Sequence, residues 1–195
     1  IWAVHRSIKD ALDYAANPDK TSNPNEEDLK RLMDYAENPD KTEQRYLISG
    51  VNCLPELAYE RMMETKRRYG KYGGIVAYHG YQSFKPGEVT PEQCHALGVE
   101  LAKRLWGDKY EVLVASHRDH EHLHNHFILN SVSFKDGEKF HCPPYYHDTV
   151  MAPESDKLCR EHGLSVIQNP QRKRAPYVAY MAEKKGKPSH RTLLK

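Results

Sequence analysis

The apolar positions of the chain follow two periods, and each period predicts one kind of element. A spacing of three and four residues begins after Ser7, a predicted N-cap, and ends at Pro18, so this segment is predicted to be a helix. The same spacing predicts four more helices, over residues 26–37, 55–69, 90–105 and 145–162. Runs rich in β-branched and aromatic residues predict five strands, over residues 1–4, 45–53, 74–84, 110–116 and 125–132.

The connections between these elements indicate the fold class. Strands and helices alternate along the chain, an order that would also suit a parallel sheet. However, the loop between the last two strands, over residues 117–124, is too short for the crossover that joins parallel strands. We therefore predict an α+β fold in which helices flank a central, mostly antiparallel sheet.

Charge divides the chain into a body and an arm. The 195 residues suit one domain, which we predict over residues 1–168. The remainder, residues 169–195, holds eight Lys and Arg against one Glu, so the arm carries +7 and the body −5. A basic arm interleaved with Tyr177 and Tyr180 suits a polyanion such as nucleic acid, and a solvated tail is the simpler alternative.

Other features of the composition limit the class of protein. No apolar run is long enough to span a membrane, and the chain opens on Ile1 without a charged and then apolar leader. The four cysteines are scattered without a CxxC pair, which favours reduced thiols over a disulfide framework. We therefore expect a cytoplasmic protein that has been trimmed at its start.

The histidine-rich segment "SHRDHEHLHNHFILNSV", residues 116–132, is a candidate metal site. His124 and His126 lie two residues apart in a predicted strand, so their side chains point to the same face. An antiparallel return could bring His117 beside them, and three neutral imidazoles leave coordination positions open, as in catalytic metal sites. Asp119 is close enough in sequence to orient an imidazole.

Three segments together resemble the motifs of conjugative relaxases, the mobilisation nucleases of the HUH endonuclease superfamily (MobA/VirD2-like, MOB-P type). "HRDHEHLHNHFILNSV" resembles their third motif, "YHGYQSFKPGEVTPE" their second, and "LDYAANPDKT" their first, which carries the nucleophilic tyrosine. The motifs occur in the family's order, and the likeness runs from about Trp2 to Ile167. The resemblance implies the HUH fold, whose sheet forms a ferredoxin-like or RRM-like palm.

The resemblance also implies a reaction: a relaxase nicks one DNA strand at an origin of transfer. A tyrosine attacks the scissile phosphate and forms a 5′-phosphotyrosine, and the leaving strand keeps a free 3′-hydroxyl. His117, His124 and His126 would bind a divalent metal, Mn²⁺ or Mg²⁺, with Zn²⁺ as a further option. Asp119 would orient His117 or take up the phenolic proton, and Ser83 would contact DNA near the cut.

The tyrosine motif occurs twice, because "LDYAANPDKT" returns as "MDYAENPDKT" 21 residues later. Tyr14 lies on the helix directly after the first strand, which is the family position for the nucleophile, and we favour it. Tyr35 lies closer to the following strand, which is the argument for the second copy. A third alternative is that both react, and a copy that does not react would anchor its helix.

Basic residues outside the three motifs are candidate phosphate contacts. They are Lys66, Arg67 and Arg68 of "KRRYGKY", and Arg172, Lys173 and Arg174 of the arm. The DNA expected from the resemblance is a hairpin beside single-stranded DNA at the origin of transfer. The resemblance further implies a longer protein, with an accessory mobilisation protein and a type IV coupling protein as partners.

Other functions are compatible with part of this pattern. A rolling-circle replication initiator of the same superfamily would share the metal and the tyrosine, but such initiators usually carry the tyrosine after the H-x-H strand. A DNA-binding module could keep the fold and the metal without cutting. A zinc hydrolase would activate water through a carboxylate such as Glu121, and a histidine-rich loop can also trap a metal adventitiously.

Overall fold

The structure is a computed structural model that describes residues 1–5, 7–17, 47–118 and 122–167. The chain divides into two units, Ile1–Ser165 and Val166–Lys195, and the elements named below belong to the first. The predicted helix over 26–37, the second tyrosine copy and the basic arm lie outside the described residues. The domain boundary at residue 168 stays a prediction.

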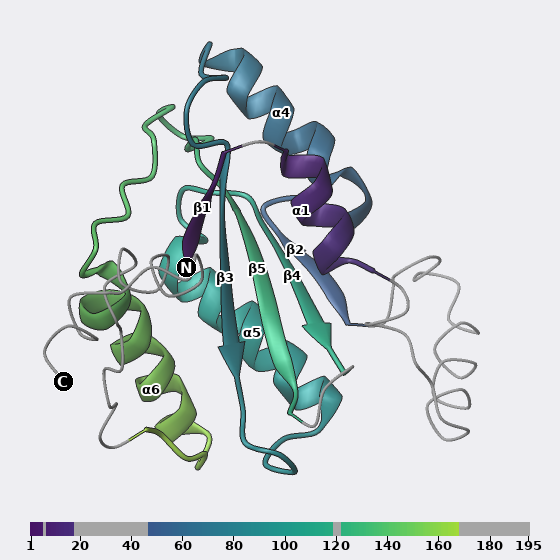
Figure 1. Ribbon diagram of the computed structural model, residues 1–195, viewed down its shortest axis with the longest axis vertical. Helices are drawn as coiled ribbons and strands as arrows, with labels where there is room; N and C mark the ends of the chain where they lie inside the picture. Colours follow the sequence, from purple (N-terminus) through teal and green to yellow (C-terminus); the bar gives the residue numbers. More distant parts are fainter. Residues whose placement is uncertain (6, 18–46, 119–121, 168–195) are drawn as a thin grey trace, which may run out of the picture. The chain divides into compact units, whose positions relative to one another are not determined.

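Five strands form one sheet in the order β1-β3-β5-β4-β2 (Figure 1). They are β1 (Trp2–Val4), β2 (Ile48–Val51), β3 (Ala77–Ser83), β4 (Val112–His117) and β5 (His124–Asn130). Every pair of neighbouring strands is antiparallel, as predicted from the short loop between the last two strands. β5 is the central strand and is paired with β3 and β4 on its two edges, so its side chains are held firmly in register.

Four helices flank this sheet in the described part of the chain. They are α1 (Ile8–Ala15), α4 (Ala58–Arg68), α5 (Pro91–Trp106) and α6 (Ala152–Glu161); the turn η1 (Pro55–Leu57) precedes α4 and the turn η2 (His147–Met151) precedes α6. The Ser7 hydroxyl accepts a hydrogen bond from the Asp10 amide, which confirms the predicted N-cap. The α+β class is confirmed, and none of the described helices combines the length and apolar composition needed to cross a membrane.

Several predicted boundaries differ from those of the structure by a few residues, and two of these differences have a local reason. The predicted strand over 45–53 ends at Val51, because Asn52 adopts a φ of 61° and its side chain donates to the carbonyls of Gly107 and Tyr110. The predicted helix over 145–162 begins instead as a π-helical turn, and the α-helix proper starts only at Ala152, just before a proline.

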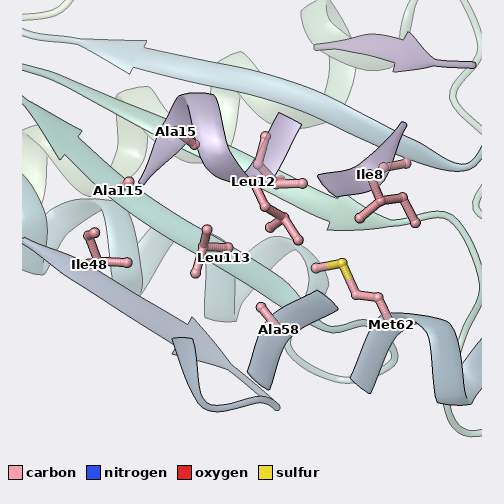
Figure 2. Close-up of a cluster of buried hydrophobic side chains, with 10 residues drawn as sticks. Ile8, Leu12, Ala15, Ile48, Ala58, Met62, Leu113 and Ala115 are labelled. Carbon is pink, nitrogen blue, oxygen red and sulfur yellow. The ribbon is translucent and has the colours of Figure 1, made fainter. Parts of the chain in front are cut away.

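The apolar core fixes α1 against the two strands that carry the histidines. Its buried members are Ile8, Leu12 and Ala15 of α1, Ala58 and Met62 of α4, and the sheet residues Ile48, Ala77, Leu113, Ala115 and Ile128 (Figure 2). Burial of each large apolar side chain stabilises the fold by about 1.5–3 kcal/mol. α5 lies on the opposite face of the sheet (Figure 1), so α1 and α4 share one face and the site described next lies on it.

Candidate active site

Strand pairing brings the three predicted histidines together at one end of the sheet. His117, the last residue of β4, is directly opposite His124, the first residue of β5, and His126 is opposite Ala115. Directly opposed residues of an antiparallel pair point to the same face, here the face covered by α1. One nitrogen from each ring can be chosen so that all three atoms lie within 4.8 Å of one another, and all three residues are buried. The predicted clustering is confirmed.

Hydrogen bonds to the protein orient each of these rings. His117 Nε2 lies 2.8 Å from the carbonyl oxygen of Ala15, and His124 Nδ1 lies 3.3 Å from that of His122. A carbonyl can only accept, so both nitrogens carry a proton, and in a neutral ring the other nitrogen is the acceptor. The lone pairs are then on His117 Nδ1 and His124 Nε2. This is the arrangement of metal-binding histidines, whose second ring nitrogen donates to a fixed acceptor.

The third ring is oriented by another histidine, His79 of β3. His79 Nε2 lies 2.7 Å from His126 Nδ1, and both side chains are buried. Burial lowers the pKa of His79 to about 4, so its ring is neutral near pH 7 and can accept from His126. In the tautomer in which His126 Nδ1 donates to His79, the lone pair of His126 is on Nε2. The three rings could thus supply three nitrogen ligands, which fits a divalent cation such as Mn²⁺ or Zn²⁺.

Helix α1 places Tyr14 beside the same cluster. The centre of its ring lies 5.6 Å from that of His126, 6.0 Å from that of His117 and 6.2 Å from that of His79. The next residue, Ala15, ends the helix and supplies the carbonyl that His117 binds, a group that a helix C-terminus otherwise leaves unsatisfied. The end of α1 is therefore attached to the histidine cluster, and Tyr14 is half exposed next to it.

A groove of about 600 Å³ opens over the cluster. It is lined by Trp2, Ala11, Tyr14, His79, Tyr81, Ser83, His122, His124 and His126. Ser83 ends β3 directly opposite His124 and is exposed, so the predicted serine lies in the groove beside the histidines. Tyr14 and Ser83 thus face the same space as two of the candidate ligands.

The predicted basic contacts are not part of this groove. Lys66 is only 1% exposed, and its ammonium donates to Asn130 Oδ1 at 2.6 Å and to Ser131 Oγ at 3.0 Å. The prediction that Lys66 contacts DNA phosphate is therefore wrong, because its charge is enclosed by protein groups. Asn130 ends β5 about 20 Å from His124 by the rise of a strand. Arg67 and Arg68 follow Lys66 at this far end of the sheet and are exposed.

Several predicted residues lie outside the part of the chain that is described. These are Tyr35, Asp119, Glu121, Arg172, Lys173 and Arg174. Conversely, His79 and Tyr81 also line the groove, whereas Ser83 was the only residue of that segment predicted to contact DNA. The alternation of "HGYQS" could have revealed them, because His79, Tyr81 and Ser83 are spaced two apart on one strand, as His124 and His126 are.

A polar network anchors the ligand strand from the opposite face of the sheet. Asn125, between His124 and His126, is fully buried and donates to the Cys94 carbonyl at 2.7 Å and to Gln82 at 3.2 Å. Its Oδ1 accepts from the Ser116 hydroxyl at 2.5 Å. Gly98 of α5 makes room for this side chain, since a Cβ there would lie 2.5 Å from Asn125. The position of β5 relative to β3, β4 and α5 is thus fixed by polar contacts directly behind the histidines.

Comparisons with known proteins agree with the resemblance in the three motifs. A family model described as "Relaxase: MobA/VirD2-like, nuclease domain" matches residues 35–164, about two thirds of the chain. The matched residues include Ser83 and the three histidines, whereas Tyr14 precedes them and Tyr35 is the first of them.

Curated relatives carry relaxase names. One "Protein rlx" of Staphylococcus aureus is 46% identical over 120 residues, which is 62% of this chain and 38% of that protein. Another is 37% identical over 142 residues, 72% of this chain and 42% of that protein. The "Group II intron-interrupted relaxase LtrB" of Lactococcus lactis subsp. cremoris is 31% identical over 111 residues, 50% of this chain and 20% of that protein. The chain matches about two fifths or less of each relative's length. By its sequence motifs, its antiparallel fold and the family match, the chain belongs to the MobA/VirD2-like relaxases.

Proposed function

We propose that this chain is the part of a relaxase that nicks one DNA strand at an origin of transfer and joins its 5′ end to Tyr14. The observation that carries the proposal is the position of the Tyr14 ring, within 6.2 Å of three buried histidine rings at the mouth of a groove. Membership of the relaxase family supports a nuclease function. The single-stranded, site-specific reaction follows from the resemblance and is proposed on that basis.

His117, His124 and His126 would hold the metal, because a hydrogen bond orients each ring and one nitrogen of each ring lies within 4.8 Å of the others. A bound divalent cation would polarise the scissile phosphate and stabilise the negative charge that develops in the transition state. Imidazole ligands favour Mn²⁺ or Zn²⁺ over Mg²⁺ by affinity, whereas phosphoryl chemistry commonly uses Mg²⁺ or Mn²⁺. Mn²⁺ satisfies both criteria and is the metal to test first.

The covalent step is a transesterification. The Tyr14 hydroxyl oxygen forms a bond to phosphorus while the bond from phosphorus to the 3′-oxygen breaks. The phenolic proton would pass to the Asp119 carboxylate or, if Asp119 instead orients His117, to water, and the leaving 3′-oxygen would take up a proton from water to become a free hydroxyl. One phosphate ester replaces another, so the reverse reaction can rejoin the strand. Ser83, on the strand next to His124, would hydrogen-bond the DNA beside the cut.

The roles of the other predicted partners rest on the resemblance. Tyr35 would serve as the nucleophile of a second transfer or as an anchor for its own segment. Arg67 and Arg68, together with the arm residues Arg172, Lys173 and Arg174, would contact DNA phosphates away from the cut. An accessory mobilisation protein and a type IV coupling protein would complete the transfer apparatus.

Incubation with DNA tests this proposal directly. The chain and its Tyr14→Phe and Tyr35→Phe variants are mixed with a single-stranded oligonucleotide that carries the origin of the element encoding it, with Mn²⁺ or with EDTA. We expect a band of increased mass on a denaturing protein gel that requires Mn²⁺ and is lost only in Tyr14→Phe. Loss only in Tyr35→Phe would move the nucleophile to the second copy. Cleavage without an adduct would favour a water nucleophile, and binding without cleavage an inactive DNA-binding module.

A further inference from the structure

Two aromatic side chains on the groove have no role in the reaction proposed above. Trp2 of β1 is 45% exposed and Tyr81 of β3 is 56% exposed, and both line the groove. Their ring centres lie 5.7 Å apart with the rings inclined at 62°. Large apolar side chains exposed next to each other on a chain with 29% charged residues indicate a contact site for a ligand.

Strand register places these rings close to the candidate ligands. Tyr81 is directly opposite His126, and Trp2 is directly opposite His79. All four side chains therefore point to the same face of the sheet. Neighbouring strands are about 4.8 Å apart, so Tyr81 is one strand spacing and Trp2 two strand spacings from β5. A nucleotide whose phosphate lies at the histidine cluster would bring a neighbouring base within reach of Trp2 and Tyr81.

Around Trp2 and Tyr81, the chemistry of the groove suits a base rather than a phosphate. Among the described residues that line it, the side chains are aromatic, imidazole, hydroxyl or methyl groups, and none belongs to Lys, Arg, Asp or Glu. Phosphate contacts depend on Lys and Arg, whereas an unpaired base binds single-strand proteins by stacking on aromatic rings. The Trp2 ring is itself supported by His79, whose ring centre lies 4.4 Å away, so its position is defined before any ligand binds.

We propose that Trp2 and Tyr81 form a subsite for one unpaired nucleobase of the nucleotide next to the scissile phosphate. The inference rests on the proposed function, because it assumes that a DNA phosphate lies at the histidine cluster. Stacking would hold the strand in line for attack by Tyr14, and it would accept any base with a preference set by stacking strength. The subsite would add to the proposed reaction a contact that positions the DNA strand, made by residues to which the three motifs assign no role.

Abasic oligonucleotides test the subsite. An abasic site is moved one nucleotide at a time along the single-stranded origin DNA, and binding in EDTA is measured by fluorescence anisotropy for the full chain and for the double variant Trp2→Ala, Tyr81→Ala. We expect one position, next to the cleaved phosphate, at which loss of the base weakens wild-type binding by about 5- to 150-fold. The affinity of the double variant for intact DNA should be lower than that of the wild type by the same factor. Removal of the base at the critical position should not lower the affinity of the double variant further.

Two controls keep the test decisive. Tyr145→Ala removes an aromatic side chain that is 63% exposed and lies outside the groove, and it should bind like the wild type. If the double variant does not fold, tryptophan fluorescence of the wild type provides the test instead. Trp106 is buried, so Trp2 is the tryptophan that a base can quench. Intact DNA should quench the emission and abasic DNA should not, and this quenching should be absent from Trp2→Phe.

The outcomes separate this proposal from the reaction scheme. Equal wild-type affinity for every abasic oligonucleotide, in a protein that forms the Mn²⁺-dependent adduct, would overturn the base subsite and leave the relaxase proposal standing. A further loss at the critical position in the double variant would also overturn it, because the base would then contact other residues. Absence of both adduct and DNA binding would instead remove the proposed function on which the subsite rests.

Discussion

A buried polar cluster lies at each end of β5. In one cluster the polar groups bind one another, and in the other they lie beside a groove. At the Asn130 end, Lys66 donates to Asn130 and Ser131, and Asn130 donates to Glu111 at 2.9 Å. These groups bind one another inside the protein. At the His124 end, each candidate ligand histidine contacts the protein through one ring nitrogen, and one nitrogen of each ring lies within 4.8 Å of one nitrogen of the other two, beside a groove.

The comparison distinguishes polar side chains that stabilise the fold from polar side chains that are available to bind a ligand. A polar cluster whose donors and acceptors are matched internally stabilises one packing arrangement. A cluster of histidines is arranged for a ligand when hydrogen bonds to the protein orient each ring and leave one nitrogen of each ring for the ligand. We therefore expect substitutions at the Lys66 end to change folding stability, and substitutions at the histidine end to change metal binding.

The largest effect is expected for Lys66→Met. Removal of the ammonium leaves Asn130 and the buried Glu111 without a cation, and breaking a buried charge network of this kind costs about 3–5 kcal/mol. Urea unfolding should show this loss in the free energy of unfolding. Arg67→Met is the matched control, because Arg67 is the exposed neighbour, and it should change stability by less than about 0.5 kcal/mol. Equal stability of the two variants would contradict the closed network.

His124→Gln should have the next largest effect, on metal binding instead of stability. Loss of a direct ligand should exceed the 10- to 100-fold typical for an outer partner, so we expect Mn²⁺ affinity to fall by more than about 100-fold. Isothermal titration with Mn²⁺ in the absence of DNA measures it. His122→Gln serves as control, since His122 contributes its backbone carbonyl and keeps it. Unchanged Mn²⁺ affinity in His124→Gln would disprove the assigned ligand set.

A smaller loss of metal affinity is expected for His79→Phe. This change keeps a ring against Trp2 but removes the acceptor for His126 Nδ1, so Mn²⁺ affinity should fall by about 10- to 100-fold. His79→Asn, which restores an acceptor oxygen, should recover part of it. If His79→Phe binds Mn²⁺ like the wild type, the contact between the two histidines does not orient the ligand.

The smallest effect concerns pH at the closed end. Burial, reinforced by the charge of Lys139, lowers the pKa of Lys66 from 10.5 to about 8. Between pH 8 and about 10.5 the unfolded chain therefore binds more protons than the folded one, so this residue makes the unfolding free energy rise with pH. The slope is at most about 1.4 kcal/mol per pH unit. Urea titrations at pH 7.5 and 9.5 should show the rise in the wild type relative to Lys66→Met; a parallel response would refute it.

The fold and the histidine cluster could be predicted because both depend on local patterns. Two-residue spacing placed His124 and His126 on one face, and a short antiparallel connection returned the chain so that His117 lies opposite His124. Ser7 marked the start of α1 through capping, which depends on neighbouring residues only.

The remaining features depend on contacts between distant segments. "KRRYGKY" suggests an exposed basic run, yet Lys66 follows Met62 by four residues on the buried side of α4. Its partner Asn130 is 64 residues away, so nothing near Lys66 in the sequence indicates that the charge is buried. The contact of His79 with His126 likewise joins β3 to β5 across 47 residues and requires the register of the sheet.

Identification of the tyrosine that carries DNA tests the central claim most directly. The chain is allowed to react with its single-stranded origin oligonucleotide and Mn²⁺, the adduct is digested with nuclease and trypsin, and the peptides are analysed by mass spectrometry. Trypsin separates the two copies, because Tyr14 falls in the peptide Asp10–Lys20 and Tyr35 in Leu32–Lys41. We predict a nucleotide on Tyr14, the tyrosine beside the histidine cluster. A nucleotide found only on Tyr35 would contradict this assignment of the active site.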